Sequence, residues 1–200
     1  MELTEVPKPR ACLWEVSMSK KALFLDRDGV VNIEVGYLHR IEDVQFVPGI
    51  FSLCRAAMRL GYRLVIVTNQ AGIARGFYTE VDFEQLMLWM KIELRAQGVE
   101  LDGVYYCPYH PEHGIGKFKR EHEDRKPGIG MLKRAEREFG ISLGESVLVG
   151  DRCSDIAAAN KAGLRQAFLV NATERGGCQG EYIEVEQLAQ VEDWLLGNSR

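Results

Sequence analysis

The sequence predicts an α/β fold in which a mostly parallel, doubly wound sheet of the Rossmann-like type carries helices on both faces. Short apolar runs, typical of buried strands, alternate with segments whose apolar residues recur at helical spacing. Three of the expected strands end in polar side chains, at Asp26, Thr68 and Asp151. Ligands bind at the carboxyl ends of the strands in such sheets, so we expect these residues to share one crevice.

The apolar pattern assigns the elements in chain order. The expected strands are 22–25, 63–70, 104–107, 146–151, 166–170 and 182–185. Helices are expected from Pro48, Thr79, Pro127, Ser154 and Leu188 onward. Thr79 and Asp82 resemble a capping box, and glycines at positions 61, 140 and 163 are expected to end three of the helices.

Length and composition favour one compact enzyme-sized domain. The 200 residues are enough to bury a core without disulfide or metal supports. We expect a single domain over 20–197, preceded by a flexible tail over 1–19, and a monomer. The formal net charge of -4 lacks the basic excess of nucleic-acid-binding proteins. Small molecules are therefore the expected partners.

Nothing in the sequence indicates export or membrane insertion. No apolar run approaches the ~18 residues of a membrane helix, and the N-terminus lacks the apolar core of a signal peptide. The five cysteines are widely scattered rather than densely spaced, which fits the reducing cytoplasm. Cys153 is expected to be a small packed residue and not a nucleophile.

Two carboxylates directly after the first strand indicate the chemistry. Asp26 and Asp28 lie two residues apart, and a buried carboxylate without a partner is costly, so a cation is expected beside them. Asp26 and Asp151 supply the oxygen ligands that Mg²⁺ prefers. With Mg²⁺ and Lys126 on the phosphoryl oxygens, Asp26 is a candidate nucleophile toward a phosphate monoester, and Asp28 a candidate general acid and base.

Four motifs in chain order resemble those of the haloacid dehalogenase (HAD) superfamily, phosphatase branch. They are Asp26-x-Asp28-Gly29, Thr68-Asn69, Lys126 and Gly150-Asp151-x-x-x-Asp155. Longer stretches are similar to the D-glycero-D-manno-heptose 1,7-bisphosphate 7-phosphatases and their histidinol-phosphatase relatives. These stretches are 26–32, 36–37, 68–76, 105–108, 125–127 and 150–151.

The resemblance implies a role for each matching residue. It makes Asp26 the nucleophile, Asp28 the acid and base, and Thr68 and Asn69 hydrogen-bonding partners of the phosphate, while Lys126 neutralises the phosphate charge. Mg²⁺ is then held by Asp151, by Asp26 and by the carbonyl group of Asp28. Asp155 is expected to orient neighbouring groups rather than to contact the metal.

The remaining matches concern the substrate. Arg125 is expected to bind a second anionic group, because its planar guanidinium suits phosphate. The other expected substrate contacts are Glu34, Gly36, Tyr37, Gln70 and Arg152. The spacing of the motifs leaves no room for a large cap domain, so the crevice is expected to be open, with the loop 108–124 and the turn 34–37 controlling entry.

The loop 108–124 departs from the family pattern. Relatives often carry a structural zinc on a Cys-x-His and a Cys-x-Cys pair, which here read Cys107-Pro-Tyr109 and His122-Glu-Asp124. His110 and His113 offer further ligands for a rebuilt site, but their spacing is not that of the family. Zinc is therefore not expected, and hydrogen bonds and charge pairs are expected to hold the loop.

The combined interpretation is a Mg²⁺-dependent sugar-phosphate phosphatase acting through an aspartyl-phosphate. The resemblance implies a heptose bisphosphate as substrate, in the cytoplasmic synthesis of activated heptose for the lipopolysaccharide core. Two alternatives stay open. One is a phosphatase for histidinol phosphate or another small monoester, and the other is a non-catalytic protein that binds phosphorylated metabolites.

Overall fold

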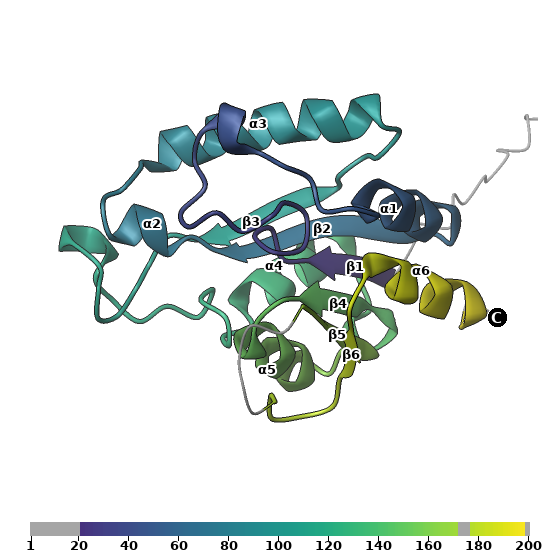
Figure 1. The fold of residues 1–200 in the computed structure, drawn as a ribbon. Helices are drawn as coiled ribbons and strands as arrows, with labels where there is room; N and C mark the ends of the chain where they lie inside the picture. The colour runs from purple at the N-terminus through teal and green to yellow at the C-terminus, as the bar shows by residue number, and fades with distance from the viewer. Residues whose placement is uncertain (1–20, 172–176, 199–200) are drawn as a thin grey trace, which may run out of the picture.

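The computed structural model describes residues 21–171 and 177–198, so the expected tail over 1–19 lies outside the described residues. Six parallel strands form one sheet in the order β3-β2-β1-β4-β5-β6 (Figure 1). The strands are β1 (Lys21–Leu25), β2 (Tyr62–Asn69), β3 (Gly103–Cys107), β4 (Val147–Gly150), β5 (Gln166–Val170) and β6 (Ile183–Val185). This is the strand order of a doubly wound sheet, which confirms the predicted fold class.

Helices cover both faces of the sheet, because both faces of its central strands are apolar. In β1, Leu23 and Leu25 enter one core cluster, whereas Ala22 and Phe24 enter the other. The first cluster packs under α1 (Ile50–Arg59), α3 (Glu80–Ala96) and α6 (Leu188–Gly197), and the second under α4 (Gly130–Phe139) and α5 (Cys153–Ala162). No helix of the described ranges is both long and apolar enough to cross a bilayer.

Short helical segments complete the connections. A single-turn helix, α2 (Ala71–Ala74), follows β2, and three 3₁₀ turns occupy η1 (Ile41–Asp43), η2 (Gly116–Phe118) and η3 (Leu143–Glu145). The sequence pattern predicted none of these four pieces. Each is shorter than the window over which helical periodicity is visible in a sequence.

Helix starts were predicted with mixed success. The capping box of α3 is confirmed: the Asp82 N–H donates to Thr79 Oγ1 (3.1 Å), and the Thr79 N–H donates to Asp82 Oδ2 (2.8 Å). The helix expected from Pro127 instead begins at Gly130, because the Gly128 N–H first closes a turn onto Arg125 O (2.6 Å). The expected cap Ser154 lies inside α5, which is capped at Arg152.

The strand order reverses between β1 and β4: β2 and β3 lie on one side of β1, whereas β4, β5 and β6 lie on the other. The Asp26 N–H donates to Val149 O (2.9 Å), which extends the pairing one residue beyond β1. Asp26 and Asp151 therefore leave neighbouring strands at the same edge of the sheet. In doubly wound folds this reversal point opens a crevice for ligands.

Cys153 is not the free packed thiol that the sequence suggested. It forms a disulfide with Cys178, with a Cα–Cα distance of 5.0 Å. The bond joins the first residue of α5 to the segment between β5 and β6, which is 25 residues away in the chain. The other two cysteines of the described residues, Cys54 and Cys107, are buried thiols.

Candidate active site

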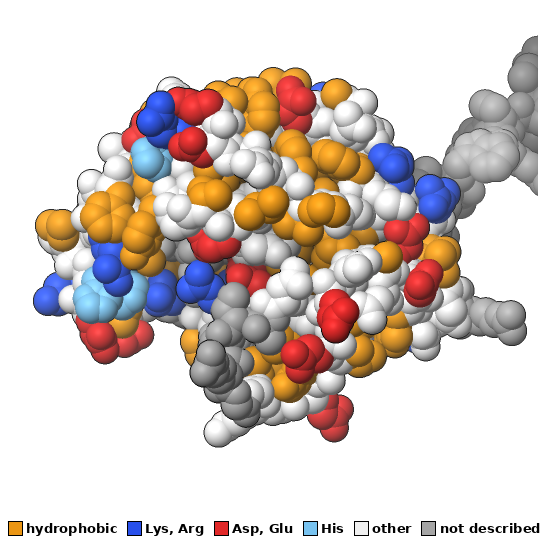
Figure 2. Space-filling view, viewed as in Figure 1, with side chains coloured by type: hydrophobic (Ala, Val, Ile, Leu, Met, Phe, Trp, Pro, Cys, Tyr) orange, Lys and Arg blue, Asp and Glu red, His pale blue; other side chains and the backbone are white. Residues whose placement is uncertain are grey.

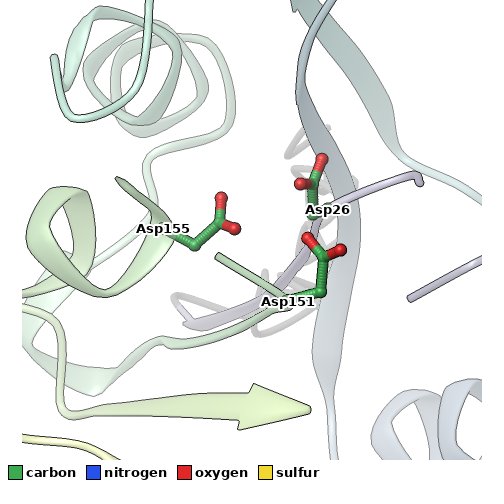
Figure 3. Close-up of side chains that lie close together, drawn as sticks. All are labelled: Asp26, Asp151 and Asp155. Atoms are coloured by element: carbon green, nitrogen blue, oxygen red, sulfur yellow. The ribbon is translucent and has the colours of Figure 1, made fainter. Parts of the chain in front are cut away.

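Three carboxylates form the floor of the crevice. Asp26 follows β1, Asp151 follows β4, and Asp155 projects from the first turn of α5 toward both of them (Figure 3). One oxygen from each of the three lies within 4.8 Å of the others, and all three side chains are buried. Carboxylates this close repel one another unless cations or protons separate them.

Lys126 supplies one positive charge to this floor. Its Nζ lies 3.0 Å from Asp26 Oδ1 and 2.5 Å from Asp155 Oδ1, and it donates to Val67 O (2.8 Å). Asn69 fixes the Lys126 backbone, because its side-chain amide donates to Lys126 O (3.0 Å) and accepts from the Lys126 N–H (3.0 Å). The end of β2 thus holds the lysine over the carboxylates.

Burial alters the acidity of the floor. It raises the pKa of Asp26 to about 7, since Asp155, Asp151 and Asp28 add to the effect of burial and together outweigh Lys126. It also raises the pKa of Asp151 to about 6, with a further contribution from Asp155. Burial alone would lower the pKa of Lys126, but the charges of Asp155 and Asp26 outweigh it and raise this pKa.

The floor fits a divalent cation. Asp151 Oδ1 is buried and has no hydrogen-bond partner, so one lone-pair site in the cluster is free for a ligand. Gly29 leaves the space beside the Asp151 carboxylate open, because a Cβ at position 29 would lie only 2.4 Å from Asp151 Oδ2. Hard oxygen donors with room for water and a phosphate oxygen suit Mg²⁺. The residues present therefore fit a magnesium site built on Asp26 and Asp151.

Magnesium affinity is expected to fall by roughly 20-fold between pH 8 and pH 6. Both carboxylates must be ionised to bind the ion, and their raised pKa values of about 7 and about 6 mean that protons compete across this range. Calorimetric titration with MgCl₂ at the two pH values measures the change. Equal affinities at pH 6 and pH 8 would contradict this assignment of the ligands.

Asp28 is held at the side of the floor by three donors. The fully buried Arg27 donates through Nη2 to Asp28 Oδ1 (2.8 Å). Asn32 Nδ2 donates to the same oxygen (3.1 Å), and Gln70 Nε2 donates to Oδ2 (3.2 Å). Arg27 was not among the predicted residues. Arg27 lies between Asp26 and Asp28 in the sequence, and this position could have identified it as a site residue. An arginine there can pair with one of the two carboxylates while its side chain stays in the core.

Above the floor lies a cavity of about 480 Å³. All the predicted site residues except Asp151 line it, and Asp151 lies in the acidic floor. The predicted residues that line it are Asp26, Asp28, Glu34, Gly36, Tyr37, Thr68, Asn69, Gln70, Arg125, Lys126 and Arg152. The structure adds five side chains that sequence reasoning did not place in the site, namely Ala71, Arg75, Tyr78, His110 and Ser154.

Part of the cavity wall is built from the turn 34–37. Glu34 Oε2 pairs with Arg152 Nη2 (3.2 Å), and Glu34 Oε1 accepts from the Gly36 N–H (2.7 Å). Tyr37 has a positive φ of 56° and packs edge-on against Phe77, with 4.7 Å between ring centroids. The turn thus reaches across the cavity to the start of α5 and to the segment after α2.

Rings and ion pairs hold the loop 108–124. The Tyr109 ring stacks on His122 (4.5 Å between centroids) and lies 4.0 Å from the Arg120 guanidinium carbon. Asp124 pairs with Arg134 Nη1 at 3.0 Å. In the described part of the chain, the group Asp26, Asp151 and Asp155 is the one that brings three potential metal ligands together. The expectation about zinc in this loop stays a prediction.

Comparisons with known proteins identify relatives of the whole fold. A family profile described as HAD-hydrolase-like matches residues 124–179. The crystal structure of D,D-heptose 1,7-bisphosphate phosphatase from B. bronchiseptica, complexed with magnesium and phosphate, superposes with a TM-score of 0.75. It is 28% identical in sequence, and the match covers 88% of this chain and 98% of that one.

Curated relatives are more similar in sequence. A D-glycero-alpha-D-manno-heptose-1,7-bisphosphate 7-phosphatase of Burkholderia mallei is 52% identical over 76% of this chain and 81% of the relative. A D-glycero-beta-D-manno-heptose-1,7-bisphosphate 7-phosphatase of Vibrio cholerae is 46% identical over 88% of this chain and 95% of the relative. The chain therefore belongs to the D-glycero-D-manno-heptose-1,7-bisphosphate 7-phosphatase family of HAD-like hydrolases.

Proposed function

We propose that this protein removes the 7-phosphate of D-glycero-D-manno-heptose 1,7-bisphosphate in a Mg²⁺-dependent reaction through an aspartyl-phosphate. The main support is the placement of a buried carboxylate, Asp26, at the floor of a cavity, beside Lys126 and close to a second carboxylate, Asp151. The identity of 52% with a relative of this activity supports the choice of substrate.

In the first step, a carboxylate oxygen of Asp26 forms a bond to phosphorus and the bond from phosphorus to the sugar oxygen breaks. Asp28 donates a proton to the departing alkoxide. Its contacts with Asn32 and Gln70 hold the carboxyl group at the cavity wall, where a leaving group can reach it. In the second step a water oxygen forms a bond to phosphorus and gives its proton to Asp28, while the bond between phosphorus and the Asp26 oxygen breaks. This regenerates the Asp26 carboxylate and releases inorganic phosphate.

Positive charge must offset the repulsion between Asp26 and the phosphoryl group. Lys126 is fixed for this purpose by its ion pairs and by the reciprocal hydrogen bonds of Asn69. Asp26, Asp151 and the Asp28 carbonyl would hold Mg²⁺, which supplies electrostatic stabilisation of the phosphoryl oxygens. Thr68 and Asn69 line the cavity beside Lys126 and are assigned the hydrogen bonds to the phosphate.

The side of the cavity that is lined by Arg125 favours a second anionic group of the substrate over a cationic one. Arg125 lines the cavity, and its Nη1 donates to Tyr109 O (3.3 Å) without a carboxylate partner among the described residues. Glu34, a carboxylate that also lines the cavity, is already paired with Arg152. A bisphosphate brings a second anion to this wall, whereas histidinol phosphate brings an ammonium group, so the contacts favour the sugar bisphosphate.

Purified enzyme assayed with Mg²⁺ on both substrates tests the assignment. We expect a higher kcat/KM for the heptose bisphosphate than for histidinol phosphate, with both anomers of the bisphosphate included. A higher value for histidinol phosphate would reverse the choice of substrate. Folded protein that releases no phosphate from any ester, with Mg²⁺ or with EDTA, would favour the non-catalytic alternative.

The proposal extends to the state of the enzyme in the cell. We infer a monomer that acts in the cytoplasm, where the family resemblance places the synthesis of activated heptose; the disulfide between Cys153 and Cys178 means that the cysteines do not support this compartment. Gel filtration and fractionation of cells that express the full chain test these two points. A stable dimer, or recovery with the periplasmic fraction, would change them without altering the chemistry at Asp26.

A further inference from the structure

The side chain of Gln70 is buried and hydrogen-bonded at both ends of its amide. Only 1% of the residue is exposed. Its Nε2 donates to Thr68 Oγ1 (2.9 Å) and to Asp28 Oδ2 (3.2 Å). Its Oε1 accepts from the Tyr78 hydroxyl (2.5 Å). Both N–H groups of the amide are therefore used by the protein itself, and one of them holds the general acid Asp28.

The two oxygens of the Asp28 carboxyl group have different surroundings. Oδ1 accepts from Arg27 Nε (3.0 Å), from Arg27 Nη2 (2.8 Å) and from Asn32 Nδ2 (3.1 Å). Oδ2 accepts from Arg27 Nη2 (2.8 Å) and, at a longer distance, from Gln70 Nε2. Three donors saturate Oδ1, so the proton that Asp28 transfers belongs on Oδ2. The oxygen that protonates the leaving group is thus the one beside the Gln70 amide.

The orientation of the Gln70 amide decides where this proton can go. With Nε2 toward Asp28, the amide donates to Oδ2 and leaves the proton on Oδ2 free to reach the departing sugar oxygen. With the amide turned over, Oε1 would accept that proton in a hydrogen bond and would compete with the leaving group. An ionised Asp28 repels Oε1, but a protonated Asp28 attracts it. Another group must therefore hold the amide while Asp28 carries its proton.

The Tyr78 ring is fixed in the position that this task requires. Tyr78 is 6% exposed, and its ring stacks on His39 with 5.1 Å between centroids and 8° between planes. The backbone of α2 comes close to the ring, because a Cβ at Gly72 would lie 2.2 Å from Tyr78 Cε1. Hydrophobic side chains gather on the surface over α2 (Figure 2). The phenol consequently reaches Gln70 from a covered and closely packed part of the molecule.

The Tyr78 hydroxyl is set as a donor toward Gln70 Oε1. Burial raises the pKa of Tyr78 to about 12, so the phenol keeps its proton at neutral pH. The positive charge of Arg27 acts on the same phenol and lowers this pKa against the effect of burial. A nearby cation attracts the hydroxyl oxygen and turns the O–H bond away from itself. The O–H is therefore directed to Gln70, and a turned-over amide would lose this hydrogen bond.

We propose that Tyr78 is a positioning residue for the general acid: its hydroxyl, acting through Gln70, keeps the donor end of the amide toward Asp28. Tyr78 touches no reacting atom in this role. The inference rests on the proposed function, because it concerns the step in which Asp28 protonates the leaving group. It also gives the Gln70 side chain a role besides the substrate contact expected from the sequence.

Two esters that differ in their need for an acid provide the test. The sugar oxygen leaves as an alkoxide that requires a proton, whereas p-nitrophenolate is stabilised by its nitro group and leaves without one. For Tyr78→Phe we expect the first-turnover rate on the heptose bisphosphate to fall about 3- to 10-fold, the effect of one hydrogen bond. The first-turnover rate on p-nitrophenyl phosphate should stay within about 2-fold of the wild-type rate. Quenched-flow and stopped-flow measurements with enzyme in excess give the two rates.

A double-mutant cycle shows whether Tyr78 acts through Gln70. Gln70→Ala should slow the sugar ester more than the aryl ester, and adding Tyr78→Phe should then slow the sugar ester no further. Losses that multiply in the double variant would contradict the proposed route. Because Gln70→Ala makes the same distinction between esters, equal slowing of both by this variant would overturn the inference even if Tyr78→Phe does not fold.

Tyr105→Phe is the matched control. Tyr105 is also buried, and its hydroxyl donates to Glu138 Oε2 (2.5 Å), but it does not line the cavity. Its loss of a hydroxyl should leave the rates on both esters unchanged. If wild-type protein hydrolyses neither ester, the proposed function fails. If wild-type protein hydrolyses both and a folded Tyr78→Phe protein slows both equally, or slows neither, the inference about Tyr78 alone is wrong.

Discussion

Asp26→Asn is expected to lower kcat on the heptose bisphosphate by at least about 10³-fold while leaving the protein folded. The amide keeps the shape of the carboxylate but cannot form the bond to phosphorus. Folding should tolerate the change, because burial raises the pKa of Asp26 to about 7 and the ionised group is not favoured there in the metal-free protein. Phosphate release and thermal unfolding, measured on the same preparation, separate the two effects.

Asp43→Asn is a suitable control, because Asp43 is an exposed carboxylate in η1, away from the cavity. The turnover and the unfolding temperature of the Asp43→Asn protein should match those of the wild type. Full turnover by a folded Asp26→Asn protein would remove the basis of the mechanism. An Asp26→Asn protein that fails to fold would show that Asp26 has a structural role which the acidic floor does not predict.

Much of the fold follows from the sequence because its signals are local. The run 22–25 is apolar at every position, which is what a strand with helices on both faces requires, and it forms the central strand β1. Glycine 140 ends α4 in the left-handed conformation that favours this residue. The meeting of Asp26 and Asp151 follows from the rule that parallel strands end at the same edge of a sheet.

Other parts of the site depend on contacts between distant segments, which spacing does not encode. Arg75 belongs to a short helix without visible periodicity, and it meets His110 only because the loop 108–124 is hydrogen-bonded to α2. The disulfide joins cysteines 25 residues apart, and connectivity cannot be deduced from their count. Ser154 is a good capping residue by type, but Asp155 already accepts from the Arg152 N–H (3.1 Å) and places the helix start earlier.

Lys126→Met is expected to destabilise the metal-free protein by about 3–5 kcal/mol at pH 8. The methionine fills a similar volume, but it leaves Asp26, Asp151 and Asp155 within 4.8 Å of one another without a buried cation. Lowering the pH to 5.5 should reduce this loss. A carboxyl group whose pKa is raised on folding stabilises the folded state most at a pH where the group is protonated. The pKa of Asp26 is already about 7 with Lys126 present, so this carboxyl group is protonated at pH 5.5. Urea unfolding at the two pH values measures the effect.

Magnesium distinguishes the structural role of Lys126 from its chemical role. A saturating concentration should restore part of the stability of Lys126→Met, because the ion neutralises the same carboxylates. Turnover should stay low, since no other described group takes the place of Nζ 3.0 Å from Asp26. Lys133→Met, which breaks a part-exposed ion pair with Glu136 on α4, should cost less than about 1 kcal/mol. A loss of stability in Lys126→Met that changes with neither pH nor Mg²⁺ would indicate a packing defect and would contradict the electrostatic role assigned to this lysine.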